Sequence, residues 1–156
     1  MKPVSAAFGI ARDAIALVVF SGQELECWKT RSLPNKEEKA RGSALAFVRW
    51  ATATFGFRAA GLESGDLGSR RKELLREEIQ SALREQGVPI LVATREQLYL
   101  AFRKPPLKKR GDMRRIISTI LPQLQAYRSD LALLDAAAFG LYLETERLLA
   151  IDPSNE

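Results

Sequence analysis

The chain has 156 residues, of which 46% are hydrophobic and 28% charged, and its net charge is +5. This length fits one domain, and this composition is typical of a globular protein rather than a disordered one. No stretch approaches the ~18 uninterrupted apolar residues of a membrane span, so we expect no membrane partner. The positive balance is compatible with a polyanionic partner.

Histidine is absent from the sequence, and Cys27 is its single cysteine. Ser-His and Cys-His catalysis, histidine metal sites and an intrachain disulfide are therefore excluded. Any metal chemistry must use oxygen ligands, which suit Mg²⁺, Mn²⁺ or Ca²⁺. A chain that cannot form a disulfide within itself fits a reducing compartment, and we expect a cytoplasmic protein.

The first third of the chain predicts three short strands. Residues 4–10 are apolar with small side chains, and residues 14–20 form a continuous apolar run that suits a buried strand. Residues 24–32 alternate between apolar and polar side chains. Because the turns at Arg12-Asp13 and Ser21-Gly22 are short, these strands should form an antiparallel meander.

Helix and strand patterns alternate after the meander. The predicted helices cover residues 36–55, 70–86, 95–102, 112–127 and 130–150, and the predicted strands cover 57–63 and 89–93. Pro122 should kink or split the helix over 112–127, and Ser129 or Asp130 should cap the last helix. The order β-β-β-α-β-α-β-α-α predicts one α/β domain over residues 1–151, with a mixed five-stranded sheet, helices on both faces and a frayed tail at 152–156.

Short motifs in the second half carry a resemblance to a known family. Residues 90–98, ILVATREQL, resemble a fifth strand that runs into a Thr-Pro-x-x-Val helix start, and residues 113–121 resemble a helix with a Met-Val-x-x-Leu-Leu core. Residues 134–141, LDAAAFGL, are similar to an Asp-Ala-Ala-Asp-Ala-Leu-Ala helix. With the order of elements, these motifs resemble the RuvC family of Holliday-junction resolvases, within the RNase H-like nucleases. The resemblance covers nearly the whole chain.

The resemblance implies a nuclease site built from carboxylates. Enzymes of this fold hold two Mg²⁺ ions with acids from the first strand, the fourth strand and the last helix, and the ions activate water and stabilise the leaving oxygen of a phosphodiester. Among these acids the resemblance places Glu63, at the end of the fourth strand, and Asp135, on the last helix. It also implies a first-strand acid where this chain has Ala11, and a second last-helix acid where it has Ala132.

Asp13 is the candidate replacement for the missing first-strand acid. If its turn bends inward, then Asp13, Glu63 and Asp135 form the catalytic and metal-ligating set, with Mg²⁺ or Mn²⁺ as cofactor. Otherwise Asp13 is a turn residue, Glu63 is an exposed strand end, and no cofactor is needed. Asp135 lies in an apolar stretch without a basic residue at helical spacing, so a distant arginine, a backbone donor, a metal or solvent must satisfy its charge.

A basic segment leads into the helix predicted over 112–127. Its members are Arg103, Lys104, Lys108, Lys109, Arg110, Arg114 and Arg115. Such residues contact phosphates, and the resemblance implies that this region faces DNA. The alternative is a solvated basic loop opposite the acidic side chains of the helix over 70–86.

Three functions are compatible with these residues. We favour a RuvC-like DNA-binding protein that recognises branched or structured DNA, with nuclease activity reduced or lost. It would act as a homodimer, because the two strands of a junction call for two symmetric sites. The second hypothesis is an active Mg²⁺-dependent endonuclease that uses Asp13, Glu63 and Asp135. The third is a catalytically dead interaction or assembly subunit, whose basic segment binds an acidic protein.

Overall fold

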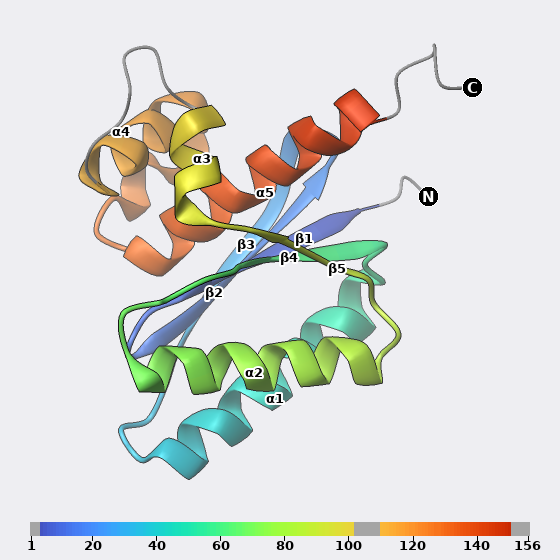
Figure 1. The fold of residues 1–156 in the computed structure, drawn as a ribbon, viewed down its shortest axis with the longest axis vertical. Helices are drawn as coiled ribbons and strands as arrows, with labels where there is room; N and C mark the ends of the chain where they lie inside the picture. Colours follow the sequence, from blue (N-terminus) through green and yellow to red (C-terminus); the bar gives the residue numbers. More distant parts are fainter. Residues whose placement is uncertain (1–3, 102–109, 151–156) are drawn as a thin grey trace.

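A mixed five-stranded sheet forms the centre of the fold (Figure 1). The structure, a computed structural model, describes residues 4–101 and 110–150, and the side chains of residues 110–112 and 146–150 fall outside this description. The strands are β1 (Ser5–Ile10), β2 (Ala14–Ser21), β3 (Glu24–Ser32), β4 (Ala59–Glu63) and β5 (Ile90–Ala93). Their order is β3-β2-β1-β4-β5; the first three pair antiparallel, and β4 and β5 are parallel to β1. The predicted meander and the mixed sheet are therefore confirmed.

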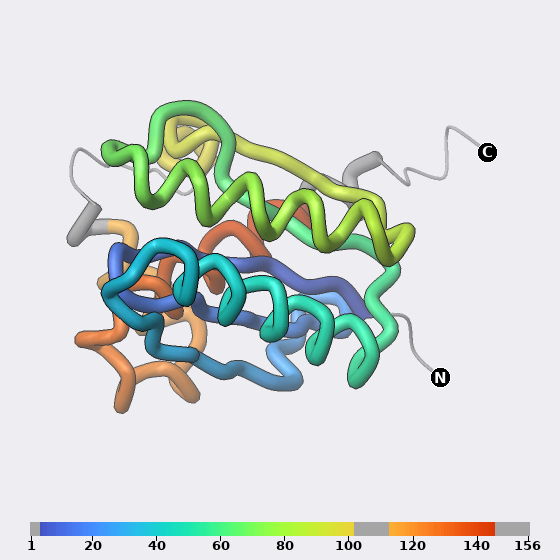
Figure 2. The backbone as a smooth tube through the Cα atoms, turned by 90° about the horizontal axis from the view of Figure 1, so that it is seen from below, coloured from blue at the N-terminus to red at the C-terminus, as the bar shows by residue number. Residues whose placement is uncertain are grey.

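Helices cover both faces of the sheet, as the element order predicts. They are α1 (Glu37–Phe55), α2 (Arg70–Glu85), α3 (Arg95–Ala101), α4 (Arg110–Ile120), the 3₁₀ helix η1 (Pro122–Tyr127) and α5 (Leu131–Ala150). Figure 1 shows α1 and α2 on one side of the sheet and α3, α4 and α5 on the other. In Figure 2, which views the molecule from below, α1 and α2 run side by side in front of the strands. The α/β fold class is confirmed.

Two hydrophobic cores lie on the two faces of the sheet, and β2 contributes to both. Side chains of a strand alternate between faces, so Leu17 and Val19 pack toward α1 and α2 while Val18 and Phe20 pack toward α5. Both faces are covered, which explains why the strand is a continuous apolar run instead of an alternating one. Each such buried side chain contributes roughly 1.5–3 kcal/mol relative to an exposed one.

Pro122 divides the helical segment that precedes α5. Helix α4 ends at Ile120, and Pro122 is the first residue of η1. Proline has no amide hydrogen for the helical hydrogen bonds, and its ring crowds the preceding turn. The prediction allowed a kink or a split, and the structure has the split. Asp130 caps α5, because its Oδ1 accepts a hydrogen bond of 3.1 Å from the amide of Leu133.

Helix α5 packs very closely against β1 at Gly9. A methyl group on Gly9 would overlap the carbonyl oxygen of Ala132, so the helix backbone rests directly on the strand. Gly9 therefore allows the approach that holds the first turns of α5, including Asp135, above the end of β1.

Part of the prediction concerns residues outside the described ranges. These are the tail at 152–156 and Arg103, Lys104, Lys108 and Lys109 of the basic segment. The extent of the single domain stays a prediction. Among the described helices, none has the length and apolar character needed to cross a bilayer.

Candidate functional site

Glu63 and Asp135 come together at the end of β4 and the start of α5. Both line a small hollow that also includes Gly9, Ile10 and Phe139. The volume of this hollow is about 10 Å³, on the order of the space that a single water molecule needs. The two acids that the resemblance places in one site are therefore neighbours in space, although they lie 72 positions apart in the sequence.

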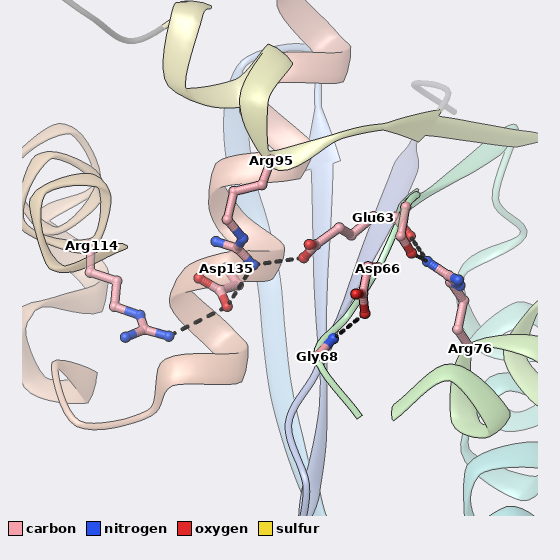
Figure 3. Close-up of polar contacts among 8 residues, drawn as sticks. Glu63, Asp66, Gly68, Arg76, Arg95, Arg114 and Asp135 are labelled. Carbon is pink, nitrogen blue, oxygen red and sulfur yellow. Dashed lines mark hydrogen bonds and ion pairs between the residues drawn. The ribbon is translucent and has the colours of Figure 1, made fainter. Parts of the chain in front are cut away.

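An arginine lies between the two carboxylates (Figure 3). Nη2 of Arg95 is 2.6 Å from Oε1 of Glu63 and 3.5 Å from Oδ2 of Asp135. The three side chains are largely withdrawn from water, with exposed fractions of 15% for Arg95 and Glu63 and 9% for Asp135. Charges in such surroundings are stabilised mainly by their ion-pair partners, because little water is present to screen them.

A second arginine reaches Asp135 from α4. Nη2 of Arg114 is 3.5 Å from the same Oδ2 atom of Asp135, on the side away from Glu63 (Figure 3). Asp135 is thus bound by two guanidinium groups from two different helices. Of the partners that the sequence leaves open for this carboxylate, the distant arginine is therefore present, from two helices.

The start of α3 fixes the position of Arg95. The amide of Gln97 donates to Oγ1 of Thr94 over 3.1 Å, and the amide of Thr94 donates to Oε1 of Gln97 over 2.8 Å, which is a capping box. The guanidinium of Arg95 also lies over the ring of Phe139, 6.0 Å from its centroid. Arg95 is therefore held at its backbone by the cap and at its head group by α5.

The guanidinium of Arg95 stays charged in this environment. Burial alone would lower its pKa, but the negative charges of Asp135 and Glu63, together with Tyr99, outweigh burial and raise the pKa above its ordinary value. The group of Arg95, Arg114, Glu63 and Asp135, which we call the arginine-bridged cluster, thus carries two positive and two negative charges and is neutral.

A neutral cluster is a poor site for a divalent ion. At a distance of about 4 Å and an effective dielectric constant of about 20, one unit charge and a divalent ion interact by about 8 kcal/mol. The attraction of two carboxylates is therefore cancelled by the repulsion from two guanidinium groups at similar distances. Within the described part of the chain no three carboxylate or thiol groups lie close enough to hold an ion. The residues present do not fit the two-metal site that the resemblance implies.

Asp13 lies away from the arginine-bridged cluster. It is exposed, and it lines two hollows, one with Ala11 and Asp130 and the other with Arg12 and Arg71. Neither hollow includes Glu63 or Asp135. The structure thus brings two of the three candidate acids together and leaves Asp13 apart, and its role as a metal ligand stays a prediction.

The residues of the basic segment that the structure describes differ in their surroundings. Arg114 is an ion-pair partner of Asp135, whereas Arg115 is exposed on the same helix. Arg110 is the first residue of α4, and its side chain is outside the description.

Sequence reasoning missed Arg95, although a signal for it exists. In the parallel pairing of β4 and β5, Glu63 lies opposite Ala93. A residue that follows β5 by two positions must therefore lie close to the end of β4. Arg95 also occupies the position at which the resembled Thr-Pro helix start has proline, so a charged side chain is introduced beside Glu63.

No protein-family model matches the sequence, and no curated protein matches it. Solved structures do match. A Thermus thermophilus RuvC in complex with a Holliday junction substrate superposes with a TM-score of 0.75 at 17% identity, over 94% of this chain and 96% of that one. The chain has the fold of RuvC.

Two further resolvases share this fold. A fowlpox virus resolvase, in a complex with Holliday junction DNA, matches with a TM-score of 0.57 at 14% identity, over 93% of this chain and 99% of that one. A yeast mitochondrial Holliday junction resolvase matches with a TM-score of 0.58 at 11% identity, over 97% of this chain and 83% of that one. The RuvC-like and RNase H-like fold inferred from the short motifs is confirmed.

Proposed function

We propose that this chain binds branched DNA, such as a four-way junction, and does not cleave it. Support for DNA binding comes from the fold, which spans nearly the full length of a RuvC and of a viral resolvase that were both solved with Holliday junctions. The net charge of +5 agrees with a polyanionic partner. Two strands of a junction call for two symmetric sites, so we propose a homodimer as the binding form.

The observation that carries the loss of cleavage is the position of Arg95. Its guanidinium lies between Glu63 and Asp135, the two carboxylates that are the remaining candidates for metal ligands. Ala11 and Ala132 supply no oxygen ligand at the other two positions. A phosphodiester could bind near this cluster. Its hydrolysis by metal-activated water would require a set of metal ligands that these residues do not provide.

Binding is tested by fluorescence anisotropy with a labelled four-way junction and a duplex of the same arm sequence, at about 50 mM and 200 mM salt. We expect the junction to bind more tightly than the duplex, and both affinities to fall as salt rises, because phosphate contacts release counterions. Absence of junction binding at the lower salt concentration would refute the proposal and favour the interaction or assembly subunit.

Cleavage is tested separately with the same junction in Mg²⁺ and in Mn²⁺. We expect no product from the wild-type chain. The control is Asp135→Asn, which removes the charge of the central carboxylate. Product from the wild type that disappears in Asp135→Asn would establish the active endonuclease instead, and variants of Asp13 and Glu63 would then show whether those residues act with Asp135.

A further inference from the structure

One oxygen of Asp135 takes no part in the ion pairs of the arginine-bridged cluster. Both Arg95 and Arg114 bind Oδ2 of this carboxylate. Its Oδ1 atom is buried, and within the part of the chain that the structure describes it accepts no hydrogen bond. The residue as a whole is only 7% exposed. A buried carboxylate oxygen without a donor is costly, so Oδ1 requires a hydrogen-bond donor from elsewhere.

The surroundings of Asp135 contain a space for such a donor. Asp135 and Glu63 line the same small hollow, whose other lining residues are Phe8, Gly9, Ile10, Leu67 and Phe139. These five residues have no polar side chain, so none of them supplies a side-chain donor to Oδ1. The hollow has a volume of about 10 Å³, close to the ~10–15 Å³ that one water molecule needs.

The charge of the cluster decides between a water molecule and a small cation. Two carboxylates line the hollow, and such acceptors would also suit a monovalent cation such as ammonium or K⁺. The cluster already carries two guanidinium groups against these two carboxylates, so a cation would leave a net positive charge in a poorly hydrated corner. A water molecule adds no charge, and it can donate two hydrogen bonds.

We propose that this hollow binds one water molecule, which donates one hydrogen bond to Oδ1 of Asp135 and the other to the carboxylate of Glu63. Both oxygens of Asp135 then have donors, Oδ2 from the arginines and Oδ1 from the water. The inference does not depend on the proposed DNA binding, because it rests on the buried acceptor, the size of the hollow and the charge of the cluster.

Relaxation dispersion of water ¹⁷O, which counts long-lived water molecules in a folded protein, tests the proposal. Leu67→Phe adds a ring to the wall of the hollow and should exclude the water. The matched control, Leu33→Phe, makes the same change in the core against α1 and α2, at a residue of similar exposure, 7% against 8% for Leu67. We expect Leu67→Phe to hold one long-lived water fewer than the wild type, and Leu33→Phe to hold as many as the wild type. Equal counts in all three proteins overturn the proposal.

A second measurement on the wild type needs no variant, and it decides the question even if Leu67→Phe fails to fold. Methyl protons of Ile10 and Leu67 should show cross peaks to water that have opposite signs in NOE and ROE spectra, as expected for a water that tumbles with the protein. Absence of these cross peaks overturns the proposal.

Thermal melts in choline, potassium and ammonium chloride at equal concentration separate a water from a cation. We expect the same Tm in the three salts. A Tm that potassium or ammonium raises in the wild type and in Leu33→Phe, but not in Leu67→Phe, shows a cation site and overturns the assignment of a water.

Discussion

Replacement of Arg95 by methionine is the sharpest test of the arginine-bridged cluster. Methionine keeps most of the length of the side chain but removes the charge that lies between Glu63 and Asp135. Removing one partner of a buried ion pair costs about 3–5 kcal/mol. Since these side chains keep some contact with water and Asp135 keeps Arg114, we expect about 3 kcal/mol, or roughly 6–12 °C in Tm for a chain of this size.

The same variant should gain a response to divalent ions. With Arg95 gone, the cluster carries a net negative charge, and an ion at about 100 times its Kd would return about 2.7 kcal/mol of stability. Thermal melts of the wild type and of Arg95→Met, each with and without Mn²⁺, measure this. We expect Mn²⁺ to raise the Tm of the variant and to leave that of the wild type unchanged.

Two controls make the result decisive. Arg49→Met breaks an exposed pair with Glu85 by the same substitution and should cost at most about 1 kcal/mol. Arg95→Met/Glu63→Gln removes one of the two carboxylates, so the rescue by Mn²⁺ should disappear. An Arg95→Met variant that is as stable as the wild type, or a wild type that gains as much from Mn²⁺ as the variant, would refute the charge balance on which the proposed loss of cleavage depends.

Three further substitutions, one of them with a control, test the cluster and its surroundings. Asp135→Asn removes the partner of two arginines and should destabilise the fold by about 2–4 kcal/mol in chemical denaturation; a loss below 1 kcal/mol would contradict the ion pairs. Gly9→Ala should cost more than about 3 kcal/mol, because the new methyl group meets the backbone of α5, whereas Gly42→Ala has open space in α1 and should stabilise by roughly 0.5–1 kcal/mol. Asp130→Ala loses the cap of α5 and the 2.6 Å hydrogen bond that Thr30 Oγ1 donates to Asp130, so it should cost about 1–2 kcal/mol, with helix content by circular dichroism as the second measurement.

The elements of the fold were predictable because their signals are local. The run at 14–20 has the length and the apolar character of a buried strand, and β2 is Ala14–Ser21. Pro122 breaks a helical pattern by its own chemistry, and it begins η1 where that chemistry requires. The mixed sheet with helices on both faces then followed from the succession of elements, because a meander followed by alternating helix and strand has few ways to pack.

The candidate site was predictable only in part because its contacts are between distant positions. The resemblance placed Glu63 and Asp135, and the isolation of Asp135 on its helix required a partner from elsewhere. Arg95 had a signal, its position two residues after the predicted fifth strand, but helical periodicity connects only residues three or four positions apart and could not choose Arg114 among the basic residues of the chain. Asp13 was proposed from its nearness in sequence to Ala11, whereas the turn that carries it lines other hollows.

The arginine-bridged cluster joins three helices through one residue, Asp135. Asp135 pairs with Arg95, which ties α3 to α5, and with Arg114, which ties α4 to α5. Two carboxylates in this position without a cation would leave a net charge of about minus two in a poorly hydrated corner, which is costly. Either metal ions or arginines can cancel that charge, and the described structure has two arginines there. The arginines thus neutralise the remaining acids and also connect α3 and α4 to α5, so the loss of metal ligands and the packing of these helices depend on the same ion pairs.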